Sequence, residues 1–525
     1  MPSRTVPASY ALPVVTALSV AAYLLWQPTA PDLTAQIARA AVINASGHIS
    51  WWTGWYGGIS LTSYSIFVPS IMAAIGVRLT AVVAVLATAA AGVPLTRDSA
   101  RPRLGAIALS IAAFADVLAG RVTFAVGFAL GTWALVALAS RKTAFTIALA
   151  ALSFLATPLA GMFLAIVLVA VALSDPTRRR PAVVSAVVLA GLAGAGALLF
   201  PAAGEMPFPA RAMIPPALGC LIVVCTRPPR IVWMSALLAL LAMPLFVLIP
   251  TPVGSNIARL SWICAVPAVV ACARLPKRRL IALAAIAAAI WPVTDLVREV
   301  HWDAPPSAGA HFYRPLAAEL VAEQRRAGAL ATGERVEVVD TADHGAAAYL
   351  ASSIAIARGW DRPTDRAANP IFYEPGALTP ASYHQWLDDL AVGWVVVPST
   401  PLDYASRAEA RLISTQLPFL ERAWTSSDWT LYRVLDAHPL ATGATIRSVG
   451  PGEVVLSTNG PSTVDIQLRW SPYLTTSSEQ AGAAAPDCLV DNHGWTRIYV
   501  GRATTFALVS HFDVAARFRS SNSSC

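Results

Sequence analysis

Charged residues are scarce in this chain, and lysine is nearly absent. Only 13% of its 525 residues are charged and 56% are hydrophobic, whereas about a quarter of the residues of a soluble protein are charged. This composition excludes an ordinary soluble globular protein and indicates a membrane protein. Lys142 and Lys277 are the only lysines, so the net charge of +8 comes almost entirely from arginine.

The chain also lacks the motifs of several large enzyme classes. It contains no P-loop, no G-x-S-x-G, no H-E-x-x-H and no dinucleotide-binding fingerprint. Most of its arginine clusters lie between apolar runs of membrane length, which argues against nucleic-acid binding and for orientation in a bilayer. Few charges lie within the apolar runs, which disfavours an ion-coupled transporter.

Eleven apolar segments have the length and composition of membrane helices, which need about 20 mostly apolar residues. We expect spans near residues 8–26, 77–95, 104–119, 122–140, 143–156, 158–174, 181–200, 212–226, 231–249, 259–273 and 280–297. The stretch 143–174 is too long for one helix and short for two, and Pro158 is its natural break. Residues 1–26 share features with a secretory signal, but no convincing cleavage site follows, so we expect a first span there.

The basic residues predict the orientation of these spans, because short cytoplasmic loops are enriched in Lys and Arg. With eleven spans and the N-terminus inside, all five basic clusters fall on the cytoplasmic side. These clusters are Arg97/Arg101/Arg103, Arg141/Lys142, Arg178/Arg179/Arg180, Arg227/Arg230 and Arg274/Lys277/Arg278/Arg279. We therefore expect a multi-pass protein of the cell membrane with a cytoplasmic N-terminus. The loop 27–76 and everything after residue 298 would lie outside.

The composition changes after Val297, which predicts further domains. We expect a transmembrane domain at 1–297 with the long first outer loop 27–76, an extracytoplasmic α/β domain at 298–440, and a β-sandwich-like module at 441–525. The α/β assignment rests on strand-like runs at 336–340, 392–398 and 429–434 and helix-like stretches near 311–328, 345–357, 379–390 and 405–416. Thr379 and Ser406 stand in cap-like positions of the last two helices. The module rests on short runs at 444–448, 453–457, 463–470, 496–500 and 504–509.

Six cysteines divide between the two halves of the chain. Cys220, Cys225, Cys264 and Cys272 lie in expected spans, where a free thiol behaves as a small apolar residue. Cys488 and Cys525 lie in the expected outer region, where disulfides persist. We predict that these two pair with each other; the alternative is two unpaired cysteines.

The expected topology gathers polar side chains at the outer membrane surface. The charged ones are Asp32, Asp116, Arg121, Glu205, Arg211 and Arg259, and the first loop adds His48, Trp51, Trp52, Trp55, Tyr56 and Tyr64. Carboxylates can act as general bases, arginines can hold a phosphate, and aromatic faces stack on sugar rings. Together these groups suit a reaction between a lipid-phosphate-linked sugar and an acceptor outside the membrane.

Plainer interpretations stand beside these assignments. Asp32 could cap the helix that follows it, and Asp116 could form an ion pair with Arg121 across a turn. Arg211 and Arg259 could be interfacial residues, and the Trp/Tyr cluster could be an aromatic belt. In the outer region, His344 follows Asp340 and Asp343, but no second ligand cluster supports a metal site, which favours a loop histidine with satisfied hydrogen bonds. Asp361, Arg362, Asp365 and Arg366 have the pattern of a solvated ion-pair turn.

The layout of the chain resembles the GT-C superfamily of membrane glycosyltransferases. The resemblance lies in a first span, a long outer loop that opens with an acid in Pro31-Asp32-Leu33-Thr34-Ala35-Gln36, about eleven spans and a C-terminal outer domain. The runs Trp51–Gly58, Ala357–Arg362 and Tyr383–Asp389 also resemble uncharacterised actinobacterial proteins of this architecture.

This resemblance implies a function and roles for particular residues. Asp32 would be the general base and Asp116 the acid of the second outer loop. The donor would be a polyprenyl-phosphate sugar, and the acceptor an envelope glycan or lipid. Some members of the superfamily need a divalent cation such as Mg²⁺ or Mn²⁺; the first loop lacks a paired acidic motif, so metal binding stays open. The alternative is a non-enzymatic transporter, or a scaffold whose outer domain binds envelope components.

Overall fold

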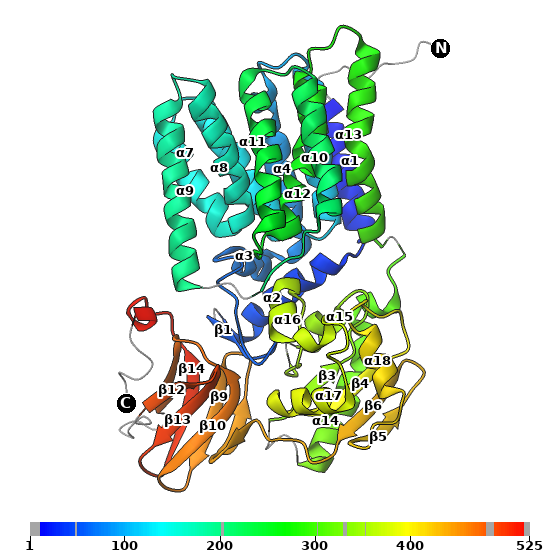
Figure 1. Cartoon of the computed structure of the whole chain (residues 1–525), viewed down its shortest axis with the longest axis vertical. Helices are drawn as coiled ribbons and strands as arrows, with labels where there is room; N and C mark the ends of the chain where they lie inside the picture. The colour runs from blue at the N-terminus through cyan, green and yellow to red at the C-terminus, as the bar shows by residue number, and fades with distance from the viewer. Residues whose placement is uncertain are drawn as a thin grey trace. The chain divides into compact units, whose positions relative to one another are not determined.

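The chain folds into two compact units in the computed structural model, which describes residues 11–47, 50–200, 204–301, 303–328, 333–351, 353–478 and 488–518. Met1–Gln36 and Ser63–Asp303 form one unit, called here the membrane unit. Ile37–Thr62 and Ala304–Cys525 form the other, called here the C-terminal unit. Figure 1 shows that the first is helical, whereas the second contains all the larger sheets.

The membrane unit has a helix at each of the eleven positions expected from the apolar segments. These helices are α1 (Ala11–Trp26), α4 (Val77–Thr96), α5 (Pro102–Leu118), α6 (Val122–Ala139), α7 (Thr143–Ala156), α8 (Pro158–Ser174), α9 (Arg179–Leu199), α10 (Ala210–Cys225), α11 (Arg230–Leu248), α12 (Ala258–Cys272) and α13 (Arg278–Glu299). The break between α7 and α8 falls at Pro158, as expected. Two short elements complete the unit, α3 (Val68–Ile75) and the 3-10 turn η1 (Gly254–Ile257). The helix α2 (Pro31–Ser46) begins in this unit and ends in the other.

Six helices in the described part of the chain are long and apolar enough to cross a membrane. They are α4, α6, α9, α11, the continuous segment of η1 and α12, and α13. Four further apolar helices are shorter: α1, α7, α8 and α10. The chain is therefore a multi-pass membrane protein. Little of α9, α11 and α13 is buried within the protein, as expected for helices that face lipid.

Small residues bring the central helices of the membrane unit together. A Cβ atom on Gly105 of α5 would lie 2.5 Å from Cβ of Ala271 in α12, and one on Gly127 of α6 would lie 2.8 Å from Cβ of Ala160 in α8. Close backbone approach at small residues is the usual basis of helix association in lipid, where apolar burial offers no driving force.

One part of the C-terminal unit is an α/β fold around a four-stranded sheet of order β3-β4-β6-β5. The strands are β3 (Arg335–Val338), β4 (Val392–Pro398), β5 (Leu420–Thr425) and β6 (Trp429–Val434). β3 and β4 are parallel, and the other pairs are antiparallel. The helical elements are η2 (Pro306–Ala308), α14 (Ala310–Ala327), α15 (Gly345–Tyr349), α16 (Arg362–Ala368), η4 (Pro370–Phe372), α17 (Pro380–Asp389) and α18 (Arg407–Ile413).

Two details of this part differ from expectation. The helix expected at 345–357 ends at Tyr349, because the chain then forms a bridge between Ile356 and Val336 of β3. Thr379 does cap α17, with its side chain accepting from the backbone N–H of Ser382. Ser406 does not cap α18 with its side chain. Its hydroxyl instead accepts from the backbone N–H of Asp340 at 3.1 Å.

The other part of the C-terminal unit is a β-sandwich. Its two sheets have the orders β12-β13-β10-β7 and β11-β14-β9-β8, and residues of both sheets share one apolar core, including Val454, Ile466 and Phe506. The strands are β7 (Ala441–Thr442), β8 (Thr445–Val449), β9 (Glu453–Thr458), β10 (Ser462–Arg469), β11 (Leu474–Ser478), β12 (Cys488–Asn492), β13 (Trp495–Val500) and β14 (Thr504–Ser510), followed by η5 (Ala515–Phe518). Cys488 is disulfide-bonded; its predicted partner, Cys525, lies outside the described residues.

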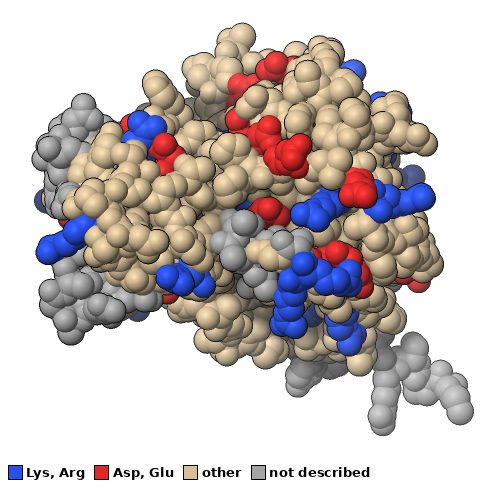
Figure 2. Space-filling view, turned by 90° about the horizontal axis from the view of Figure 1, so that it is seen from below, with Lys and Arg blue, Asp and Glu red and all other residues tan. Residues whose placement is uncertain are grey.

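Charged side chains on one face of the molecule are mixed in sign. Figure 2 shows Lys and Arg beside Asp and Glu in several places, with uncharged residues covering most of the face. Within α14 of the C-terminal unit, Arg326 pairs with Glu319 at 2.9 Å.

Candidate active site

Six charged side chains come together in the membrane unit, and we call them the charged cluster. Its members are Asp32 of α2, Asp116 of α5, Arg121 between α5 and α6, Arg259 of α12, and Asp295 and Glu299 of α13. The guanidinium of Arg121 is its centre, with nitrogen–oxygen distances of 3.4 Å to Asp32, 3.6 Å to Asp116, 3.8 Å to Asp295 and 2.6 Å to Glu299. Asp116 and Arg121 thus form the ion pair that sequence reasoning offered as the plainer alternative, within a larger network.

Backbone contacts explain why these distant residues meet. The turn between α5 and α6 lies against the start of α2, since a Cβ atom on Gly120 would be 2.3 Å from the backbone nitrogen of Leu33. Gly120 has a φ of +82°, and glycine suits this turn because it adopts positive φ readily and has no Cβ to clash with Leu33. Thr29 and His301 form an antiparallel bridge, which ties the segment before α2 to the segment after α13. Asp32, Arg121 and Glu299 are therefore held together by the main chain.

The cluster has a buried part and an accessible part. Asp116 and Arg121 are buried, whereas the side chains of Asp32, Asp295 and Glu299 are 35%, 30% and 34% exposed. Burial alone would lower the pKa of Arg121, but the surrounding carboxylates outweigh this and raise its pKa above the ordinary value. Arg121 is therefore a permanent cation that fixes the carboxylates around it.

Asp32 lies between two arginines. Arg121 and Arg259 approach the same carboxylate oxygen, Oδ2, at 3.4 and 3.3 Å. Among the described residues, Oδ1 of Asp32 has neither a hydrogen bond nor an ion pair. Arg259 has Asp32 as its single carboxylate partner in the described part of the chain, and it also lies 6.0 Å from the ring centroid of Phe124. Asp32 thus has one oxygen held and one available, and Arg259 has donors left for a ligand.

The other expected site residues of the membrane unit lie outside this network or at its border. Tyr64 is half-buried and its hydroxyl accepts from Thr123, two residues after Arg121, at 3.3 Å. Glu205 and Arg211 are exposed and form no ion pair with any described residue. The loop that carries them packs near the start of α12, since the backbone N–H of Met206 donates to the carbonyl of Thr251. His48 lies outside the described residues.

The aromatic residues of the first loop do not form an open surface. Trp51–Trp52 (β1) pairs with Ile59–Ser60 (β2) in a hairpin that belongs to the C-terminal unit. Trp52, Trp55 and Tyr56 are fully buried, and Trp51 packs against the core of the sandwich. The indole N–H of Trp55 donates to the carbonyl of Ala347.

The expected stacking of these rings on a sugar is therefore wrong for Trp52, Trp55 and Tyr56. The position of these rings close to Asp32 along the chain gave no sign that they are buried, because a residue that contacts the hairpin lies more than 290 positions away. The hairpin instead joins the two parts of the C-terminal unit, since Ile356 and Arg469 donate backbone hydrogen bonds to the carbonyls of Gly54 and Gly57.

The residues present do not fit a metal ion. In the charged cluster, the carboxylate oxygens point to the guanidinium of Arg121, which occupies the centre that a cation would need. No group of three His, Cys, Asp or Glu side chains within the described segments has the arrangement of a metal site. We therefore derive no step through a divalent cation.

Sequence reasoning missed Asp295 and Glu299. Both lie in the last turns of α13, four residues apart and hence on one face of the helix. Two acids at this spacing at the end of the last apolar segment were a usable signal, because charges near the hydrocarbon are costly unless they are paired.

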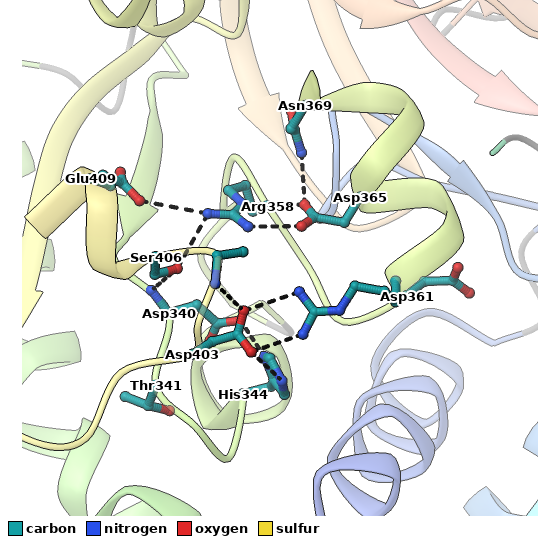
Figure 3. Close-up of polar contacts among 12 residues, drawn as sticks. Asp340, Thr341, His344, Arg358, Asp361, Asp365, Asn369, Asp403, Ser406 and Glu409 are labelled. Atoms are coloured by element: carbon teal, nitrogen blue, oxygen red, sulfur yellow. Dashed lines mark hydrogen bonds and ion pairs between the residues drawn. The ribbon is translucent and has the colours of Figure 1, made fainter. Parts of the chain in front are cut away.

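A second network lies in the C-terminal unit, shown in Figure 3. Arg358 forms a bidentate pair with Asp365 at 3.1 and 2.7 Å and lies 3.6 Å from Glu409 and 4.0 Å from Glu337. All four side chains are buried. The expected solvated turn at 361–366 is therefore wrong, because Asp365 points into the protein toward Arg358.

Burial sets the pKa values in this second network. It raises the pKa of Glu409 to about 7, and burial together with the neighbouring Glu409 raises the pKa of Glu337 well above its ordinary value. For Asp365, burial is outweighed by Arg358, so its pKa is lowered. Burial therefore favours the protonated form of Glu337, so the network carries less negative charge than its residue types suggest.

Comparisons with known proteins give a fold likeness and no family. The chain matches no family model and no curated protein. Solved structures that resemble it are GT-C membrane glycosyltransferases. Arabinofuranosyltransferase AftD from Mycobacteria has 13% identity and a TM-score of 0.44 over 96% of this chain and 57% of that one. ArnT from Cupriavidus metallidurans, bound to undecaprenyl phosphate, has 14% identity and a TM-score of 0.44 over 83% and 100%.

The chain thus spans a little under three fifths of the mycobacterial protein. At these scores the likeness establishes neither the family nor the function of this chain, so we base its function on the residues described above.

Proposed function

We propose that this chain is a cell-envelope glycosyltransferase that moves a sugar from a polyprenyl-phosphate donor to a glycan or lipid acceptor on the outer face of the membrane. One observation carries the proposal: Asp32 is partly exposed, is held between Arg121 and Arg259, and belongs to a unit of apolar helices. Carboxylates near the hydrocarbon are costly, so a partly exposed one with an uncommitted oxygen favours a functional role.

In the proposed reaction, Oδ1 of Asp32 is the base, and an arginine beside Oδ2 binds the donor phosphate. Oδ1 takes the proton from an acceptor hydroxyl while that oxygen bonds to the anomeric carbon of the donor sugar. The bond between the anomeric carbon and the donor phosphate breaks, and the polyprenyl phosphate leaves with the electron pair. Arg259 lies beside Asp32 and can hold the departing phosphate through its remaining N–H donors. Arg211, exposed in the first turn of α10, is a second candidate for this contact.

The buried residues position the base. Arg121 fixes Asp32 through Oδ2, and Asp116 and Glu299 fix Arg121. Asp116 is thus assigned a positioning role here, because it is buried behind Arg121. Tyr64 and Glu205 remain substrate-binding candidates at the border of the cluster.

We also propose how the chain is oriented in the membrane. All eleven apolar helices cross the membrane, the N-terminus is cytoplasmic, and the charged cluster and the C-terminal unit are extracytoplasmic. The arginine-rich loops support this orientation, since the loops between α4 and α5, α6 and α7, and α8 and α9 carry the basic clusters. None of these three loops contributes to the charged cluster.

The first test replaces Asp32 with Asn, which keeps the size and removes the base. With radiolabelled sugars on a panel of polyprenyl phosphates and membrane acceptors, we expect wild type to transfer label and Asp32→Asn to be slower by about 100- to 10,000-fold. Asp98→Asn, an exposed acid of the α4–α5 loop, is the matched control and should keep the wild-type rate.

Other outcomes distinguish the alternatives. Equal transfer by wild type and a folded Asp32→Asn protein would move the base to another residue, with Asp116 the next to change. Absence of transfer with every donor, together with binding of envelope glycan, would favour the scaffold interpretation.

A further inference from the structure

Four side chains of the C-terminal unit form a column that ends at its surface, and we call it the stack. The imidazole of His344 lies 3.4 Å from the ring of Trp360 between centroids, with the planes 8° apart. The guanidinium of Arg362 lies 4.7 Å from the ring of Trp360 and 4.7 Å from that of Tyr404. The stack therefore runs from His344 through Trp360 and Arg362 to Tyr404.

Acidic partners hold the stack in place. Asp403 accepts two hydrogen bonds from Arg362, at 3.0 and 2.8 Å, and lies 3.8 Å from Nε2 of His344. Asp340 pairs with Nδ1 of His344. Figure 3 shows both aspartates beside His344. The backbone N–H of Asp403 donates to the carbonyl of Asp340 at 3.0 Å, so the two acids are also fixed to each other.

Exposure changes along the stack from buried to open. His344 is 2% exposed, Trp360 and Arg362 are half-buried, and Tyr404 is 59% exposed. Single exposed apolar residues are common on protein surfaces and need no explanation. Tyr404 differs because its ring rests on an arginine that is itself fixed by Asp403 and Trp360. Its side-chain entropy is therefore already reduced before any ligand binds.

His344 also has a backbone conformation that residues with side chains rarely adopt. Its φ is +55°, in the left-handed region, and it stands just before α15. Such conformations cost free energy and persist where the surroundings enforce them. The strain lies at the buried end of the stack, where it directs the imidazole onto Trp360.

A second arginine is linked to the open end of the stack through Tyr373. Arg366 is one helical turn after Arg362 on α16, and its guanidinium lies 4.9 Å from the ring of Tyr373. Tyr373 in turn lies 6.5 Å from Tyr404 between ring centroids. The Nε atom of Arg366 is buried and has no hydrogen-bond partner among the residues described. This buried nitrogen cannot reach a ligand, but the side chain of Arg366 is only half-buried, and its terminal nitrogens form no hydrogen bond or ion pair with any described residue. A rigid aromatic ring together with such donors matches a sugar ring, which presents C–H groups on its face and hydroxyls at its edge.

We propose that Tyr404 and Arg366 form a glycan-binding subsite in the C-terminal unit, which holds one sugar ring of a polymeric acceptor on the face of Tyr404. The role of this glycan as the acceptor rests on the proposed function, whereas the binding of the glycan does not. The subsite holds the acceptor at a sugar ring that is remote from the reacting hydroxyl. It therefore contributes to acceptor affinity and does not touch the reacting atoms.

The test measures binding to the full-length Asp32→Asn protein in nanodiscs, so that transfer cannot consume the ligand. The probes are linear hexasaccharides of mannose, arabinofuranose and glucose, and binding is followed by calorimetry and by the fluorescence of tryptophan. We expect at least one hexasaccharide to bind, and Tyr404→Ala to weaken that binding by about tenfold. Tyr404→Phe should retain it, because the ring face remains, and Arg366→Gln should weaken it by a smaller factor.

Tyr499→Ala is the matched control, since Tyr499 is an exposed tyrosine of the sandwich at 40% exposure, and it should bind as the parent does. Equal affinity of Tyr404→Ala and its parent would overturn the proposal, as would failure of all three hexasaccharides to bind. The readout is independent of the transfer assay: binding that depends on Tyr404, together with no transfer by the wild-type protein from any donor, would support the subsite and refute the transferase.

Discussion

Each unit of this protein surrounds one arginine with several carboxylates, and the two arrangements differ in exposure. Around Arg358 in the C-terminal unit, Glu337, Glu409 and Asp365 are all at most 4% exposed. Around Arg121 in the membrane unit, three of the four carboxylates are 30% to 35% exposed. The same residue types are therefore sealed in one place and open to a ligand in the other.

Exposure decides what each network can do. A sealed network is shielded from water, and burial raises the pKa values of Glu337 and Glu409 and so favours their uncharged forms. An open network is reached by water, which screens its charges. It can also exchange water for a substrate hydroxyl or phosphate. Hence we assign stability to the Arg358 network and chemistry to the Arg121 cluster.

The largest effect is expected for Arg358→Met, which leaves three buried acids without a cation. Removing one partner of a buried ion pair costs about 3 to 5 kcal/mol. The measurement is hydrogen exchange of the amides of β3 and β4, which should lose protection. Arg497→Met is the control, because Arg497 pairs with Asp465 at the surface, where both are about a third exposed. If the two variants lost the same protection, the distinction between sealed and open networks would be wrong.

The next effect is a dependence of stability on pH. The pKa of Glu409 is about 7 in the folded protein against an ordinary value of 4.5, so the folded state binds this proton more tightly than the unfolded state does. Its stabilisation is full below pH 4.5 and is lost as the pH rises to about 7. The loss amounts to about 3 kcal/mol. Asp365 acts in the opposite sense, and only below its ordinary pKa of 3.8.

Glu409→Gln should make this dependence shallower without abolishing it, since the amide cannot titrate but Glu337 keeps its raised pKa. The amide oxygen can still accept from the hydroxyl of Tyr383, which lies 2.8 Å from Glu409. Unfolding of the C-terminal unit by urea, followed between pH 4.5 and 7.5, measures the slope. Glu421→Gln changes an exposed acid of β5 and should leave the slope as it is. A wild-type stability that does not fall over this range would contradict the assignment.

Apolar patterning predicted a helix at each of the eleven expected spans and most strands, because these elements have continuous or alternating apolar residues. It did not predict α3 or α16. The strand β4 has the bounds expected from its Val-rich run. The polar edge strand β5 was missed, because four of its six residues are exposed and it has no apolar alternation. Likewise β11, with the sequence Leu-Thr-Thr-Ser-Ser, carries no strand pattern of its own and is defined by pairing with β14.

Side-chain partners were predictable only where they lie close in sequence or on one expected surface. The pair of Asp116 and Arg121 spans a single turn, and the expected topology placed Asp32 and Arg259 on the same side of the membrane. The ion pair between Arg39 and Asp361 joins residues 322 positions apart, and no local sequence pattern predicts it. The burial of Trp52 and Trp55 in the C-terminal unit is of the same kind, since it depends on which core accepts the hairpin.

The smallest loss of stability in this comparison is expected for Arg121→Met, the counterpart of Arg358→Met. Asp32, Asp295 and Glu299 can each turn to water when the guanidinium is removed, and Asp116 alone is left buried without its partner. One unpaired buried group costs about 1 to 3 kcal/mol, which is less than the loss expected at Arg358. Thermal unfolding in nanodiscs measures it. Transfer should nevertheless fall, because Oδ2 of Asp32 then retains Arg259 as its single anchor. Destabilisation as large as that of Arg358→Met, with transfer unchanged in the folded fraction, would show that Arg121 serves the fold and not the base.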